Sequence, residues 1–356
     1  MARRSHTYCG SYARPPLSSA GKETMVDAIR KIHALYDAGI PFYTKEKLRE
    51  VSEQLEKHVE RGQKVSVMGL DEVIYDFEIE TGRNLGTFDT DFDFILREPI
   101  LHYSGIQHLT SRRDEVAPLY AYCNIRIAHC MEPPHRSSKE ILEAPLSCTR
   151  EEVETNFQCV RAQWESSDAR KHLKSMLCSI DFPSPVTKIV GFACASMAYD
   201  LQHACRQASA FQHALLLTLQ EDIGEKQGNN SHHIRCYAQE PAYDSIDEHV
   251  LAGHNITVLD DPKGFLEVDD STVVFSCAPN VPVKEIIADI ARPAVMIWNR
   301  VCEDDPTHAK TDPNSPRVRQ LARSSYKELE FPGDEEHFGD VAIYVRHTSL
   351  QSSCEA

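Results

Sequence analysis

The sequence predicts an α/β fold, with a Rossmann-like, doubly wound parallel sheet and an α-rich N-terminal half. Two observations lead to this prediction. From residue 185 onward, short apolar runs alternate with stretches of helical periodicity, which is typical of consecutive β-α-β units. The first of these runs contains Gly191 and ends in small residues, with Ser196 at the turn into the next helix. A doubly wound sheet places its ligand site at such a strand end.

The individual elements of this region follow from local signals. Gly253 ends one expected helix, because glycine adopts the left-handed conformation found just after helices. Pro282 opens another, because the first helical turn leaves its N–H groups unused. The expected strands cover residues 187–194, 234–238, 256–259, 273–277, 294–298 and 341–345, and the expected helices cover residues 201–219, 245–251 and 283–290.

The chain divides into four expected regions. Apolar residues three or four apart over residues 24–60, and acidic residues opening a stretch at 151–175, predict helices before the sheet begins. Between them, short strands are expected at 65–68 and 125–129 in an otherwise irregular segment. The regions are a flexible tail at 1–22, an α-rich region at 23–180, the Rossmann-like core at 181–302, and a linker with a final strand returning to the core at 303–356.

Charge and composition exclude several classes of protein. A net charge of −16 disfavours a dedicated binder of duplex DNA, because neutralising phosphates requires a basic face. The apolar run at residues 214–217 is far too short to cross a membrane, and the N-terminus lacks the apolar segment of a signal peptide. The 12 cysteines include no Cys-x-x-Cys pair. We therefore expect a soluble, cytoplasmic protein with free thiols, no bound metal, and no DNA or membrane partner.

Ser196 has two interpretations. Its hydroxyl, at the turn after a buried strand, is placed like a nucleophile that attacks an activated ester, with helix N–H groups stabilising the oxyanion. The same position suits a serine that caps the helix. Ala193 and Ala195 stand where a pyrophosphate-binding loop has glycine, which disfavours a nicotinamide-dependent enzyme.

Three acidic residues near the end of the first core helix are candidate catalytic groups: Glu221, Asp222 and Glu225. Glu221 and Glu225 are four residues apart, so they share a face if the helix extends that far. Paired carboxylates can hold a guanidinium group or orient an amine. The alternative is a solvated surface turn.

Gly191, Tyr243, Asp260 and Asp261 are candidate substrate-binding residues, because each lies near the end of an expected strand. An acid at such a place can hold a ribose hydroxyl, or the terminal adenosine of a tRNA. The alternative for the two aspartates is a turn, since Asp-Asp-Pro favours one. The alternative for Gly191 is close packing at the strand end.

The core region contains seven short motifs. They are residues 191–196, Gln212-His213-Ala214-Leu215-Leu216, Gln239-Glu240-Pro241-Ala242-Tyr243, Asp260-Asp261-Pro262-Lys263-Gly264-Phe265, Ala278-Pro279-Asn280-Val281-Pro282, Ala291-Arg292-Pro293 and Ile297-Trp298. Together they resemble the fungal members of the "Sensitivity to Red Light Reduced" domain family, over about residues 185 to 302.

The resemblance implies one of two functions. Some fungal members are arginine-containing cyclodipeptide synthases, which join arginine from arginyl-tRNA to a second amino acid from its aminoacyl-tRNA, giving a diketopiperazine in secondary metabolism. The aminoacyl ester of the tRNA supplies the energy for this reaction, so the resemblance implies no cofactor. That group has an Asp-Asp-x-x-Glu motif, and the nearest match here is residues 221–225, where Glu221 replaces the first Asp. Other family members imply a non-catalytic regulatory or interaction protein.

A tRNA-dependent enzyme with a net negative charge must gather its basic residues on one surface. Two clusters are candidates for this surface, and a solvated helix face is the alternative for each. The first is Arg161, Arg170, Lys171 and Lys174, and the second is Arg317, Arg319, Arg323 and Lys327.

Overall fold

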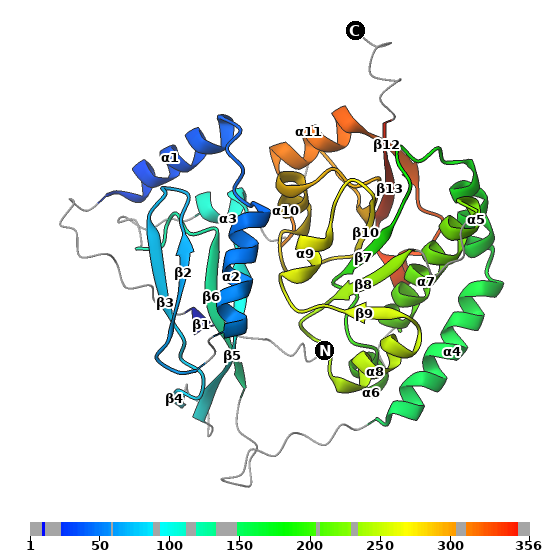
Figure 1. Cartoon of the computed structure of the whole chain (residues 1–356), viewed down its shortest axis with the longest axis horizontal. Coiled ribbons are helices and arrows are strands. Elements are labelled where there is room, and N and C mark those ends of the chain that lie inside the picture. The colour runs from blue at the N-terminus through cyan, green and yellow to red at the C-terminus, as the bar shows by residue number, and fades with distance from the viewer. Residues whose placement is uncertain are drawn as a thin grey trace. The chain divides into compact units, whose positions relative to one another are not determined.

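The computed structural model divides the chain into two compact units, Met1–Leu146 and Ser147–Ala356, which are described separately (Figure 1). This division lies well before the boundary at residue 180 that the sequence suggests. Of the expected tail at residues 1–22, only Cys9–Gly10 is described. The structure describes residues 9–10, 23–57, 60–87, 93–111, 119–132, 148–203, 207–228, 234–303 and 311–347.

The first unit combines helices with antiparallel strands, so it holds more strand than the sequence predicts, while the expected α-rich region at 23–180 also includes α4 and α5 of the second unit. β2 and β3 form a hairpin, and the other strands form a sheet in the order β1-β6-β5-β4. The elements are β1 (Cys9–Gly10), α1 (Met25–Asp37), α2 (Lys45–Lys57), β2 (Lys64–Met68), β3 (Ile74–Glu78), β4 (Asn84–Thr87), β5 (Asp93–Tyr103), α3 (Ile106–Thr110) and β6 (Ile125–Glu132).

The strand that periodicity misses most clearly is β5. Its pairing with β6 shifts register between Leu96 and Pro99. Proline lacks the N–H group that a sheet ladder needs, and an irregular register interrupts the alternation of apolar and polar residues. By contrast, α1 is predicted correctly, because Met25, Ala28 and Ile32 are buried along one face at helical spacing.

The second unit is a mixed α/β structure around a large, mostly parallel sheet in the order β12-β13-β11-β10-β7-β8-β9. β7 to β11 are mutually parallel, and β13 runs antiparallel to both β11 and β12. Its elements are α4 (Arg150–Ser166), α5 (Asp168–Ser179), β7 (Lys188–Phe192), α6 (Met197–Gln202), α7 (Ala208–Lys226), β8 (Arg235–Gln239), α8 (Ser245–Gly253), β9 (Ile256–Val258), α9 (Lys263–Glu267), β10 (Thr272–Ser276), α10 (Val283–Ile290), β11 (Val295–Asn299), α11 (Pro316–Ser325), β12 (Tyr326–Glu330), α12 (Glu335–Phe338) and β13 (Val341–Arg346).

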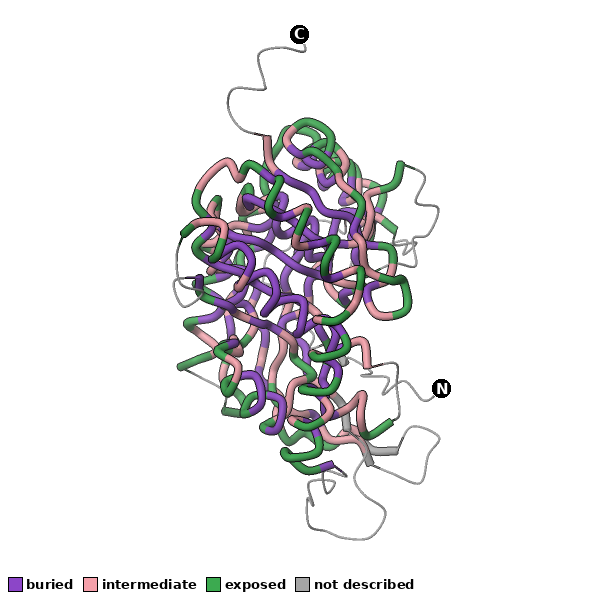
Figure 2. The backbone as a smooth tube through the Cα atoms, turned by 90° about the vertical axis from the view of Figure 1, so that its right-hand side faces the viewer, coloured by how far each residue is buried: buried purple, intermediate pink, exposed green. Residues whose placement is uncertain are grey.

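Helices cover both faces of this sheet (Figure 1). α4, α5 and α7 lie on one side, and α9, α10 and α11 on the other. Every residue of β7 and of β10 is buried, as expected for central strands covered on both faces. Figure 2 shows the buried residues gathered in the interior and the exposed residues mainly on the outer segments.

Two elements of the sheet region differ from the prediction. The expected helix at residues 201–219 is two helices, α6 and α7, and Gln207 before α7 has a left-handed φ of 57°. β12 lies inside the expected linker, because its Tyr-Lys-Glu-Leu-Glu sequence reads as polar chain. Charged side chains are typical of a strand at a sheet edge, where one side meets water. Among the described residues, no helix is both long and apolar enough to cross a membrane.

Candidate functional site

The five parallel strands end at one edge of the sheet, here called the carboxyl edge. In the sheet, β8 and β9 lie on one side of β7, and β10 and β11 lie on its other side. The pair β7–β10 is therefore the point where the order of strands reverses. Ligands of open α/β sheets bind in the crevice at this position.

Three alanines at this edge have left-handed backbones. Ala193 and Ala195 follow β7 with φ of 57° and 56°, and Ala278 follows β10 with φ of 48°. An L-residue costs about 1–2 kcal/mol in this region, so the surroundings must hold it there. The N–H of Ala195 donates to Glu240 Oε2 at 3.2 Å. Strained backbone of this kind clusters at functional sites, and here it flanks the β7–β10 pair.

Acidic side chains follow the next two strands. Glu240, directly after β8, also accepts a hydrogen bond at Oε1 from the N–H of Ala242, at 2.9 Å. Asp261, after β9, accepts one from Gln239 Nε2 at 2.9 Å. Asp260 pairs with Lys263 at 3.1 Å and its side chain is 85% exposed. The structure thus brings both predicted aspartates to the carboxyl edge, although each already has a partner.

The first backbone N–H groups of α6 donate hydrogen bonds to a carboxylate of the protein itself. Asp247, fully buried in α8, accepts hydrogen bonds at Oδ1 from the N–H groups of Met197 and Ala198, at 2.9 and 3.1 Å. Burial raises the pKa of Asp247, and a hydrogen bond from the Ser196 side chain partly offsets this. Ser196 Oγ accepts from the N–H of Tyr199 at 2.9 Å.

These contacts favour the capping interpretation of Ser196. Its side chain is the N-cap of α6, and the residue is only 3% exposed. The N–H groups of Met197 and Ala198, which the nucleophile hypothesis needs for an oxyanion, already donate to Asp247. The predicted catalytic role is therefore left without its electrostatic support.

Tyr243 and Gly191 also have packing roles. The Tyr243 hydroxyl lies 2.6 Å from His213 Nε2, and His213 Nδ1 lies 2.7 Å from the Ser209 carbonyl oxygen. Burial lowers the pKa of His213 to about 4, so its ring is neutral near pH 7. A Cβ on Gly191 would lie 2.8 Å from Leu216 Cδ1, which explains glycine there without a ligand.

Two buried polar atoms near the switch point have no hydrogen-bond partner among the described residues. They are Ser276 Oγ and Trp298 Nε1. Ser276 is the last residue of β10, paired in register with Phe192 of β7 and with Trp298 of β11. Both residues are fully buried. An unsatisfied buried donor costs about 1–3 kcal/mol, so such groups call for an explanation.

The predicted catalytic acids lie at the opposite end of the sheet. They are on the last turns of α7, which leads back to the start of β8. The Gln227 side chain after α7 bonds to the backbone of Val186, just before β7 begins. This is the amino edge, away from the strand ends where ligands bind.

The acids at the amino edge are neutralised by residues predicted to contact tRNA. Both oxygens of Asp222 bond to Arg170, at 2.7 and 3.0 Å, and both residues are buried. These ion pairs fasten α4 and α5 to α7, so neither predicted role is supported. We call them the ion-pair cluster. It consists of Arg161–Glu221 at 2.7 Å, Arg170–Asp222, and Lys174–Glu225 at 2.9 Å.

The remaining basic candidates are also engaged. Lys171 pairs with Asp168 at 2.8 Å, and Arg317 with Asp289 at 2.9 Å. Arg323 pairs with Glu303. Arg319 donates to the Asn314 carbonyl oxygen, and Lys327 lies in β12. None of these contacts gathers the second cluster into a patch beside the carboxyl edge.

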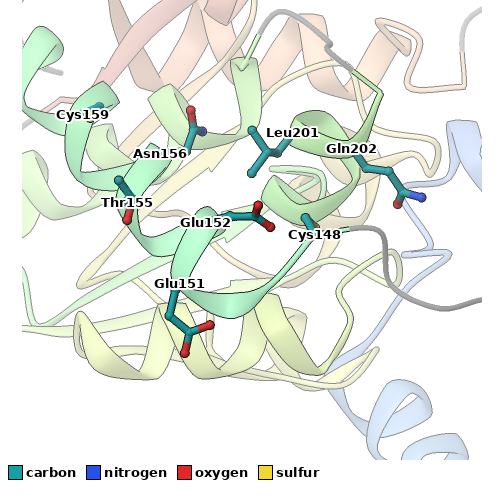
Figure 3. Close-up of a pocket in the computed structure, with 8 residues that line it drawn as sticks. All are labelled: Cys148, Glu151, Glu152, Thr155, Asn156, Cys159, Leu201 and Gln202. Carbon is teal, nitrogen blue, oxygen red and sulfur yellow. The ribbon is translucent and has the colours of Figure 1, made fainter.

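A separate open hollow of about 660 Å³ lies between α4 and α6 (Figure 3). Glu151 and Glu152 belong to the first turn of α4, and Glu152 accepts a hydrogen bond from the N–H of Thr149. This capping contact explains Glu152 without a ligand. No group of three or more metal-ligating side chains occurs in the described residues. The lining residues are Cys148, Glu151, Glu152, Thr155, Asn156, Cys159, Leu201 and Gln202.

Sequence reasoning missed Glu240 and Asp247, the two acids that organise the carboxyl edge. One signal was available for Glu240, because it is the first residue after the second strand, where dinucleotide-binding folds place an acid. The local signal at Asp247 is a capping box with Asp244, which indicates a helix start and not a role at the carboxyl edge. Its other partners, the N–H groups of Met197 and Ala198, are about 50 residues away in sequence.

Comparison with known structures gives only distant similarity. An O-methyltransferase family protein from Burkholderia thailandensis is 8% identical over 58% of this chain and 63% of that chain, with a TM-score of 0.31. Phosphoethanolamine N-methyltransferase 1 from Haemonchus contortus is 10% identical over 59% and 52%, with a TM-score of 0.26. The chain thus spans less than two thirds of either protein.

Sequence comparison is more specific. No curated protein sequence matches the chain. A domain model does match, over a segment that includes all the motifs quoted above and extends beyond them on both sides. Residues 172–345, which carry the whole parallel sheet, match the family model of the SRR1 domain, the Sensitivity to Red Light Reduced domain.

Proposed function

We propose that the second unit is a Rossmann-like, doubly wound domain that binds a nucleoside at its carboxyl edge. One observation carries this proposal: the order of strands reverses between β7 and β10, and the loops after both strands have left-handed alanines. Crevices at such reversals are where open α/β sheets hold nucleotides and related ligands.

Glu240 is the residue we assign to the ribose. In dinucleotide-binding folds an acid beyond the second strand accepts hydrogen bonds from ribose hydroxyls. Glu240 holds this position after β8, and its contacts with the N–H groups of Ala195 and Ala242 fix its orientation.

Titration of the full-length protein with adenosine, followed by ligand-observed NMR or calorimetry, tests this proposal. We expect saturable binding that Glu240→Gln weakens about tenfold, because a hydrogen bond to a charged group is worth about 1.5–3 kcal/mol. Glu225→Gln is the matched control, since Glu225 lies at the amino edge and should leave binding unchanged. A folded wild-type protein that binds no nucleoside would refute the proposal.

A second proposal rests on the family resemblance alone: a tRNA-dependent cyclodipeptide synthase that uses arginyl-tRNA. If so, its chemistry belongs at the carboxyl edge, where Asp260 and Asp261 lie, and not at Glu221, Asp222 and Glu225. Expression in a host rich in tRNA, with mass analysis of the medium, tests it. Finding no arginine-containing cyclic dipeptide from folded protein favours the regulatory alternative.

A further inference from the structure

The positions that hold phosphate in doubly wound proteins are already occupied here. Those proteins place phosphate at the N-terminus of the helix after the first strand. That helix is α6, and its first N–H groups donate to Asp247 and Ser196. A phosphate there would have to displace a fully buried carboxylate.

Two further backbone N–H groups near the site also donate to carboxylates of the chain. The N–H of Ala195, in the loop after β7, donates to Glu240. The N–H of Ser209, at the start of α7, donates to Asp200 Oδ2 at 3.1 Å. Three carboxylates of the chain thus fill the places where an anionic ligand finds N–H groups.

The charge of the edge has the same sign. The segments that follow the five parallel strands are residues 193–196, 240–244, 259–262, 277–282 and 300–303. They contain one basic residue, Arg300, which pairs with Glu328, Glu330 and Asp340. Two of their acids pair with cations outside these segments, Asp260 with Lys263 and Glu303 with Arg323. Like charges repel most strongly where water is scarce, so this edge disfavours a phosphate. Their acids are Glu240, Asp244, Asp260, Asp261 and Glu303.

Two buried groups near this edge have no partner among the described residues, and both are neutral. Ser276 Oγ and Trp298 Nε1 belong to residues that pair in register near the ends of β10 and β11, and Ser276 also pairs in register with Phe192 across the reversal point. A hydroxyl and an indole N–H suit uncharged ligand atoms such as ring nitrogens and hydroxyls. Neither supplies the positive charge that a phosphate requires.

We propose that the ligand is a nucleoside that carries no phosphate on its 5′ carbon and has a positively charged 5′ substituent, as in an adenosyl sulfonium. This inference rests on the proposed nucleoside site and specifies its ligand. The carboxylates that exclude phosphate also attract a cation. The terminal adenosine of a tRNA has a 5′ phosphodiester, so it fits this edge less well.

Calorimetric titration with S-adenosylmethionine, S-adenosylhomocysteine, adenosine and adenosine 5′-monophosphate tests the inference. We expect the monophosphate to bind about tenfold or more weakly than adenosine, a difference of about 1.4 kcal/mol. The sulfonium should bind more tightly than the neutral thioether, and more so at low salt.

Charge-removing variants make the test specific. Asp247→Asn keeps an oxygen that can accept from Met197 and Ala198, but it removes the charge and the oxygen that accepts from the N–H of Asp244. Where it folds, it should reduce the preference for adenosine over its monophosphate about tenfold. Glu240→Gln should act in the same direction if Asp247→Asn fails to fold, and Glu225→Gln should not.

The possible outcomes separate this inference from the proposal on which it depends. If the monophosphate binds as tightly as adenosine, or the thioether as tightly as the sulfonium, the ligand class is wrong while the nucleoside site stands. If none of the four compounds binds to folded protein, the nucleoside site itself is wrong.

Discussion

The two edges of one parallel sheet use acidic residues differently. At the amino edge, Asp222 of α7 is buried against Arg170 of α5, and each neutralises the other. At the carboxyl edge, the buried Asp247 accepts hydrogen bonds from backbone N–H groups of α6. The first arrangement joins helices to one another. The second places carboxylates at the strand ends, where we propose that a ligand binds.

The comparison teaches where to look for function in an acidic α/β protein. A carboxylate beside an arginine attracts attention in a sequence, because such residues are common in catalysis. Here these pairs serve packing, and the functional candidates are acids whose partners belong to the backbone. Variants at each edge can therefore break the comparison.

The largest expected effect is on stability at the amino edge. Asp222→Asn removes the buried charge that Arg170 faces and leaves it only Glu165, at 3.0 Å, as an ion-pair partner among the described residues. Breaking a buried pair in this way costs about 3–5 kcal/mol. Chemical denaturation should show this loss in the free energy of unfolding, with nucleoside binding retained under native conditions. Normal stability with lost function would instead restore a catalytic role for Asp222.

Measuring stability as a function of pH tests the environment of the buried His213, which contacts Tyr243. His213 has a folded-state pKa of about 4, below its unfolded value of about 6.5. Its contribution to the free energy of unfolding is therefore fully present above pH 6.5 and is lost as the pH falls toward 4. The stability advantage of wild type over His213→Gln should therefore shrink by up to about 3 kcal/mol between pH 7 and pH 4.

Measuring this advantage as a difference is necessary. Burial raises the pKa of Asp312 to about 6, so the protein loses stability through Asp312 as the pH rises. In the wild-type curve by itself, this change opposes the one that His213 causes. Taking the difference cancels Asp312, which is present in both proteins. A constant difference across the pH range would mean that His213 is not buried in its neutral form.

Packing at the end of β7 gives a smaller effect. Gly191→Val places methyl groups against Leu216, and overpacking of this kind typically costs about 1–3 kcal/mol. Gly253→Ala is the matched control, because nothing lies within 4 Å of its Cβ position. Thermal unfolding of both variants checks the prediction. Equal behaviour would argue against close packing at Gly191.

The smallest effect is expected at the exposed member of the ion-pair cluster. Glu225→Gln removes a partner of Lys174 whose side chain is 66% exposed. Exposed pairs add little to stability, so the unfolding midpoint should not move measurably. A large loss would show that the whole cluster, and not Asp222 alone, holds α5 on α7.

Much of the second unit can be predicted from the sequence, because buried parallel strands are continuous apolar runs that local periodicity detects. β7 and β10 are examples. β12 is not predicted, because its charged residues, which face water at the sheet edge, interrupt the apolar pattern of a strand. The antiparallel strands of the first unit escape because Pro99 and a register shift interrupt β5.

The site was harder to predict for a different reason. Arg170 and Asp222 are 52 residues apart, and no local pattern says that they will neutralise each other. The sequence therefore presents one ion pair as two separate candidates, a tRNA contact and a catalytic acid. For Asp260 and Asp261 the prediction of position is correct, because a residue that follows a parallel strand must lie at the carboxyl edge.

The order of the last two strands has a consequence for synthesis on the ribosome. β12 leaves the ribosome first, yet in the described sheet it pairs only with β13, which also pairs with β11. Tyr326–Glu330 therefore has no neighbour to join until Val341–Arg346 has emerged. At this edge of the described sheet, the outermost strand can therefore be added only after the strand that follows it in the chain.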